Sequence, residues 1–217
     1  MIFAPLGCLA AILLVLSVPL ILVLFFINVV SFSFGELGMS PSTAVALITA
    51  MLVGSLINIP LSRRRVSYAM PNTMRGFFAP PPAAYSGVAI NVGGAIVPLC
   101  LCGYLATVLP SLWPVGVATA VMTAVSKALA RVVPGRGIVL PVFVPPVLSA
   151  LLALLLAPGF AAPCAFISGT AGTVMGADVL NLRRLKGFPG MVSIGGAGVF
   201  DGIFLVGIVA VVLTALA

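Results

Sequence analysis

Two aspartates are the residues of this sequence best suited to chemistry. Asp178 lies in the stretch GADVLNL and Asp201 lies 23 residues later in SIGGAGVFDGIFLVG, both within long apolar surroundings. An ionisable side chain in such surroundings usually faces a protein interior. Two carboxylates that share a low-dielectric site hold one proton between them. Such a pair can activate water and protonate a leaving amine, or carry a proton, so Asp178 and Asp201 are predicted as catalytic candidates.

The depths of the two acids set a condition on this pairing. Asp178 lies five residues before Arg183, which also suits a capping acid or one that reaches the membrane interface beside that arginine. On a continuous helix Asp201 would lie nearly 15 Å inside the membrane, about two turns deeper than Asp178. The two carboxylates can meet only if the segment from Ser193 to Gly198 is unwound, which its glycines permit.

A second group of polar and glycine residues is typical of a binding site. Asn58 and Asn91 each stand beside a helix-breaking element, Pro60 and Gly93–Gly94. Discontinuous helices of this kind build substrate and ion sites in transporters, whereas simple interhelical hydrogen bonding is the alternative role. The predicted substrate- or ion-binding residues are Asn58, Asn91, Asn181, Ser193, Gly195, Gly196 and Gly198.

No metal site and no cofactor are predicted. The sequence has no histidine, and none of its four cysteines forms a CxxC pair. The cysteines fall in or near apolar segments, where a thiol behaves as a small hydrophobic side chain.

Composition indicates a polytopic membrane protein with an all-α fold. Of the 217 residues, 62% are hydrophobic and 6% are charged, whereas a soluble domain has about 25% charged residues. The uncharged runs predict a single integral membrane domain over 1–217, a helix bundle of about seven transmembrane helices. The predicted spans are 9–31, 42–61, 87–109, 113–132, 138–158, 160–181 and 192–216.

The basic residues orient this bundle. All ten fall on one side of the predicted membrane, and Glu36 falls on the other. By the positive-inside rule the N-terminus is expected in the cytoplasm and the C-terminus outside, in a multi-pass protein of the inner (plasma) membrane. The net charge of +7 is then explained by basic clusters beside the cytoplasmic ends of the spans, so no nucleic-acid partner is expected. The expected partners are the lipid bilayer, a membrane-embedded peptide or small solute, and further copies of the chain.

Similar stretches in the two halves suggest an internal repeat. VGSLINIPLSRRR and NVGGAIVPL in the first half resemble MGADVLNLRRLK and SIGGAGVFD in the second, in the same orientation. The repeats would be 1–109 and 138–217, joined by the span 113–132, which is a 3+1+3 layout of parallel repeats. Independent use of small-residue packing motifs would produce the same likeness.

Several stretches of this sequence resemble two known families. GADVLNL and GVFDGIFLVG resemble the active-site helices of presenilin-type (GxGD) intramembrane aspartyl proteases, although Phe200 stands where that motif has its second glycine. The resemblance implies Asp178 and Asp201 as the catalytic pair. GSLINIPL, INVGGAIVPL, ISGTAGTVMGADVLNL and SIGGAGVFDGIFL resemble the bacterial and archaeal membrane-protein family called domain of unknown function 1614, which implies no activity.

Three functions remain open on this evidence. The first is an intramembrane aspartyl hydrolase that uses Asp178 and Asp201. The second is a proton- or cation-coupled carrier of small solutes, in which the same acids bind the coupling ion and Asn58 and Asn91 line the path. The third is a non-catalytic role in the membrane.

Overall fold

Seven α-helices form within the described part of the chain, which is residues 3–65, 85–133, 137–185, 190–196 and 202–217 of a computed structural model. Each helix falls on one of the seven apolar segments, so their number and order agree with the sequence-based prediction. Their bounds are α1 Phe3–Glu36, α2 Pro41–Gly54, α3 Val97–Val108, α4 Trp113–Leu129, α5 Val144–Leu156, α6 Ala161–Thr173 and α7 Gly202–Ala215.

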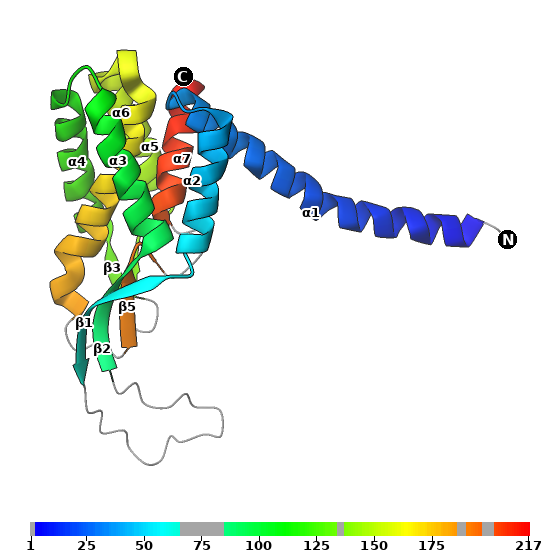
Figure 1. Ribbon diagram of the computed structural model, residues 1–217, viewed down its shortest axis with the longest axis horizontal. Coiled ribbons are helices and arrows are strands. Elements are labelled where there is room, and N and C mark those ends of the chain that lie inside the picture. The colour runs from blue at the N-terminus through cyan, green and yellow to red at the C-terminus, as the bar shows by residue number, and fades with distance from the viewer. Residues whose placement is uncertain (1–2, 66–84, 134–136, 186–189, 197–201) are drawn as a thin grey trace.

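Helix α6 forms the centre of the bundle. It packs against α3, α4, α5 and α7, and every residue from Cys164 to Thr170 is buried. Successive helices from α2 to α7 run in alternating directions, whereas most of α1 projects away from the bundle (Figure 1). The last turns of α1 join the core through Val30 and Phe34, both fully buried.

Short helical segments of other types extend or link these helices. The π-helix η2 (Val92–Ile96) leads directly into α3, and the π-helix η4 (Val174–Asp178) continues α6. The 3-10 helix η5 (Val179–Leu185) follows η4, and the 3-10 helix η3 (Pro158–Phe160) precedes α6. Asp178 is therefore the last residue of a π-helix rather than part of a regular α-helix.

The all-α prediction is wrong in part, because a small sheet lies at one end of the bundle (Figure 1). The strands β1 (Asn58–Arg65), β2 (Tyr85–Asn91) and β5 (Gly190–Ile194) form it in the order β1-β2-β5. Strand β1 pairs antiparallel with β2, and β2 pairs parallel with β5. A separate antiparallel pair consists of β3 (Arg131–Val133) and β4 (Gly137–Val139).

These strands replace the ends of predicted spans. Pro60 has no amide hydrogen to donate and ends any continuation of α2, and the register of β1 against β2 shifts directly after it. The predicted spans 42–61, 87–109 and 192–216 each give their sheet-side residues to a strand. The sequence did not indicate these strands, because a short apolar run is compatible with a buried strand as well as with a helix.

Helix length bears directly on the predicted seven spans. In the described ranges, two helical stretches are long and apolar enough to cross a membrane, Ser17–Glu36 and Pro158–Arg184. The other apolar helices have 10 to 17 residues, whereas a span needs about 20. Location in a membrane, and the orientation of the termini, therefore stay predictions.

Candidate functional site

The candidate site lies where helices stop at the sheet end of the bundle. Four segments are broken there: α2 gives way to β1, β2 to η2, η4 to η5, and β5 to a glycine turn. Hydrogen bonds between side chains and backbone amides join these breaks. They bring together several residues predicted from the sequence, although those residues are up to 137 positions apart (Asn58 to Gly195).

Asn91 is the hub of this network. Its side chain is fully buried, and its Nδ2 donates to the carbonyl oxygen of Ser55 at 2.7 Å and to Asn58 Oδ1 at 3.1 Å. Its Oδ1 accepts from the backbone amide of Gly94 at 2.7 Å, which caps the start of η2. A single amide side chain thus joins the end of α2, the first residue of β1 and the start of the helix that becomes α3.

Asn58 extends the network toward β5. Ser193 donates its hydroxyl to Asn58 Oδ1 at 2.6 Å, so that oxygen accepts from both Ser193 and Asn91. Asn58 is exposed and Ser193 is half-buried, whereas Asn91 is buried. The predicted residues Asn58, Asn91 and Ser193 therefore form one cluster that has an open side.

Asp178 is connected to the glycine turn after β5. Its Oδ2 accepts a hydrogen bond from the backbone amide of Gly195 at 3.0 Å, and the aspartate is half-buried. Gly195 and Gly196 have φ angles of +80° and +73°, a region that favours glycine. A Cβ on Gly195 would lie 2.6 Å from Ala95 Cβ, so the turn also needs glycine for space.

The required unwinding is present over the part of the segment that the structure describes. Residues 193–196 form the end of a strand and a turn, and α7 begins only at Gly202. Gly198 and Asp201 lie outside the described residues, so the contact between Asp178 and Asp201 stays a prediction.

Asn181 supports the site from its own helix. Its side chain is fully buried, and Nδ2 donates to the carbonyl oxygens of Gly176 and Ala177, each at 3.0 Å. These bonds span the junction between η4 and η5 and so fix the backbone on both sides of Asp178. Asn181 is a positioning residue here, because its hydrogen bonds hold the helix rather than the Asn58–Asn91–Ser193 cluster.

Some buried side-chain oxygens of the described residues have no hydrogen-bond partner, among them Ser126 Oγ, Thr173 Oγ1 and Asn181 Oδ1. Ser126 faces Gly176, since a Cβ on that glycine would lie 2.8 Å from Ser126 Cβ. Sequence reasoning did not select Ser126. Its position in the sequence, one residue before Lys127 on α4, did not indicate that its side chain would be buried.

No three His, Cys, Asp or Glu side chains gather within the described ranges. Asn58, Asn91 and Ser193 provide neutral oxygen and nitrogen atoms, and the only carboxylate joined to the turn within this part of the chain is that of Asp178. Such a set can donate hydrogen bonds to, and accept them from, a polar solute or a peptide group.

Comparison with known proteins identifies one family whose model matches this chain. The family described as "Protein of unknown function (DUF1614)" matches residues 52–213, a stretch that contains every candidate residue from Asn58 to Asp201. No curated protein and no solved structure matches the chain.

Proposed function

The chain belongs to the DUF1614 family, whose description assigns no activity, and from its geometry we propose that it is an integral membrane aspartyl hydrolase. In this proposal Asp178 and Asp201 are the acid pair, and the substrate is a peptide segment held in or at the membrane. The active site opens at the sheet end of the bundle, beside the Asn58–Asn91–Ser193 cluster.

The observation that carries the proposal is the hydrogen bond between Asp178 Oδ2 and the amide of Gly195. It fixes Asp178 against a segment that reaches Asp201 six residues later. A continuous helix would separate the acids by about two turns. A strand and a turn take the place of that helix over residues 193–196, which supports a meeting of the two carboxylates.

The chemistry follows from two acids that share one proton. The ionised carboxylate removes a proton from a water molecule, and the resulting oxygen attacks the carbonyl carbon of the peptide bond. The protonated carboxyl group then gives its proton to the leaving amine. The amide of Gly195 holds one oxygen of Asp178, so the orientation of that carboxyl group is set before substrate arrives.

The surface of the molecule supports a location in the membrane. Large apolar side chains such as Phe143, Leu155 and Leu56 are 77 to 78% exposed, far more than a soluble protein needs. The sheet end carries β1, β3 and η5, which include Arg63–Arg65, Arg131 and Arg183–Arg184. By the positive-inside rule that end faces the cytoplasm, and the N-terminus is cytoplasmic and the C-terminus external.

A second function is favoured by a different observation. The exposed Asn58, the half-buried Ser193 and the buried Asn91 form a graded polar cluster at the ends of broken helices, as in many transporters. In a proton- or cation-coupled carrier the cluster would bind a small solute, and Asp178 would bind the coupling ion.

The test uses the purified protein in lipid vesicles with a panel of single-span peptides, and mass spectrometry detects cleavage. Asp178→Asn and Asp201→Asn should each lower the cleavage rate by a factor of about 100 or more, the scale of general acid–base catalysis. Glu36→Gln is the matched control, because Glu36 is the third acid of the chain and lies at the end of α1. Cleavage that persists in Asp201→Asn would refute the hydrolase. Solute-dependent proton uptake without cleavage would establish the carrier.

A further inference from the structure

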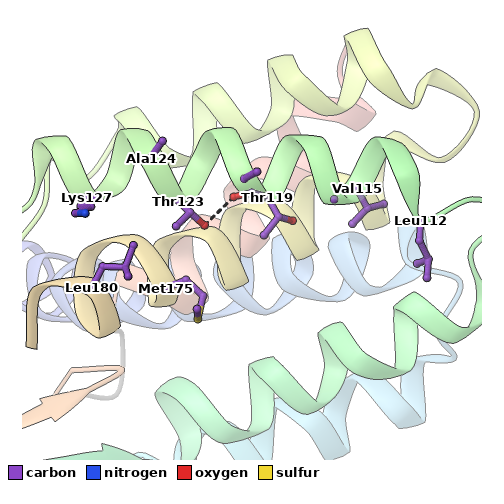
Figure 2. Close-up of a pocket in the computed structure, with 10 residues that line it drawn as sticks. Leu112, Val115, Thr119, Thr123, Ala124, Lys127, Met175 and Leu180 are labelled. Carbon is purple, nitrogen blue, oxygen red and sulfur yellow. Dashed lines mark hydrogen bonds between the residues drawn. The ribbon is translucent and has the colours of Figure 1, made fainter.

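An open apolar groove runs along α4, and η4 and η5 contribute residues to its other side. Its volume is about 730 Å³, and Figure 2 shows Leu112 and Lys127 at its opposite ends. The lining residues come mostly from α4, and Met175 and Leu180 come from η4 and η5. The complete lining is Leu112, Val115, Gly116, Thr119, Ala120, Thr123, Ala124, Lys127, Met175 and Leu180.

Small side chains make the groove deep enough for a thin, flexible occupant. Gly116, Ala120 and Ala124 follow one another at four-residue spacing and are all exposed. Thr123 donates its hydroxyl to the carbonyl oxygen of Thr119 at 2.8 Å, so this hydroxyl is already satisfied within α4. Apart from the hydroxyl of Thr119 and the ammonium group of Lys127, the walls of the groove therefore offer mainly van der Waals contact.

One end of the groove is cationic. Lys127 is the one charged residue among those that line it, and the side chain is exposed. The nearby chain adds Arg131 just after α4 and Arg183–Arg184 just after Leu180, all exposed. From Leu112 to Lys127 the helix rises about 22 Å, somewhat more than the roughly 15 Å depth of one leaflet's hydrocarbon.

We propose that this groove binds an anionic phospholipid, with one acyl chain along α4 and the phosphate at Lys127. The inference rests on the membrane location in the proposed function but not on the hydrolase chemistry. A second helix is the other occupant that a floor of small residues accepts. Lys127 favours the lipid, because a helix packed along the full groove would cover this ammonium group, whereas a phosphate at the interface pairs with it.

The test is native mass spectrometry of the detergent-purified protein with added phosphatidylglycerol or phosphatidylcholine of identical acyl chains. The wild-type protein should retain phosphatidylglycerol about five-fold better, the scale of one lysine–phosphate interaction near a membrane surface. Lys127→Gln should remove most of this preference and leave weaker binding of phosphatidylglycerol. Arg131→Gln is the matched charge control, since Arg131 lies outside the groove lining, and it should keep most of the preference.

A second pair of variants tests the groove itself. Ala120→Leu fills the floor and should reduce retention of both lipids, whereas Ala128→Leu, at an exposed alanine of α4 outside the lining, should not. Equal retention of the two lipids by the wild-type protein overturns the proposal, as does unchanged retention in Ala120→Leu. A dimer lost only in Ala120→Leu also overturns it, because a second copy then fills the groove. Asp201→Asn should retain lipid normally, which separates failure here from failure of the hydrolase.

Discussion

The two glycine pairs of this chain have similar sequences and different backbones. Gly93–Gly94 follows β2 and Gly195–Gly196 follows β5, and these two strands lie side by side and parallel. After β2 the chain enters the π-helix η2 and continues as α3. After β5 it makes a turn with φ angles of +80° and +73°, and α7 begins only at Gly202.

The two glycine pairs differ in the group that accepts a hydrogen bond from the backbone amide of the second glycine. The amide of Gly94 donates to the side-chain oxygen of Asn91, which caps a helix. The amide of Gly196 donates to the backbone carbonyl of Ser193 at 3.2 Å, which closes a turn, while the hydroxyl of Ser193 goes to Asn58. Only this uncapped pair presents an amide, that of Gly195, to an acid of another helix. The connection to Asp178 thus comes from the glycine pair that forms a turn and not from the pair that begins a helix.

The largest expected effect comes from Gly195→Ala. The new Cβ would require a strained positive φ and would lie 2.7 Å from the amide nitrogen of Ala95. The φ strain and the overpacking together should lower the free energy of unfolding by about 3 kcal/mol. Thermal denaturation in detergent measures this, with Gly103→Ala as the control, since nothing lies within 4 Å of a Cβ there. Equal melting temperatures for both variants would show that the turn does not need glycine.

A smaller effect is expected from the two residues that precede the glycine pairs. Asn91→Ala removes two donated bonds and the cap of Gly94, which should cost about 2 to 3 kcal/mol at this buried position. Ser193→Ala removes its bond to the exposed Asn58 and should cost about 1 kcal/mol or less. Chemical denaturation of the two variants compares them directly. A larger loss in the free energy of unfolding for Ser193→Ala than for Asn91→Ala would contradict the idea that the capped glycine pair contributes more to stability.

Much of the helical architecture could be predicted from the sequence. Long apolar runs separated by proline- and glycine-rich connections predicted seven helices in the observed order, because apolar length is a strong signal. The sheet could not be predicted in this way. Strands β2 and β5 are short apolar runs at the ends of longer ones, and their pairing joins residues about 100 positions apart, which no local pattern encodes.

For the candidate site, the sequence pointed to Asn58 and Asn91 because each stands beside a helix-breaking element, as in the discontinuous helices of transporter sites. The structure joins these two residues and Ser193 by hydrogen bonds, and their role in binding stays a prediction. The backbone partners of Asn91 were not predictable, since the carbonyl of Ser55 and the amide of Gly94 are main-chain groups that carry no sequence signal. The parallel superposition of the two halves, and the meeting of Asp178 with Asp201, stay predictions.

The smallest expected change in stability belongs to Asp178→Asn. The side-chain carbonyl of asparagine occupies the place of one carboxylate oxygen and can still accept the hydrogen bond from Gly195. Asp178→Ala removes that acceptor and should cost about 1.5 kcal/mol or more, the scale of a hydrogen bond to a charged group. Melting temperatures should therefore rank wild type close to Asp178→Asn, with Asp178→Ala clearly lower.

The same pair of variants separates the structural role of Asp178 from its proposed chemistry. An amide cannot exchange a proton with water as a carboxyl group does, so Asp178→Asn should be as inactive as Asp178→Ala while it remains as stable as the wild-type protein. Full cleavage activity in Asp178→Asn would show that Asp178 only holds the uncapped glycine turn. A large loss of stability in Asp178→Asn would show instead that the turn needs the negative charge, and the hydrogen bond to Gly195 would then be a charge-assisted support of the fold.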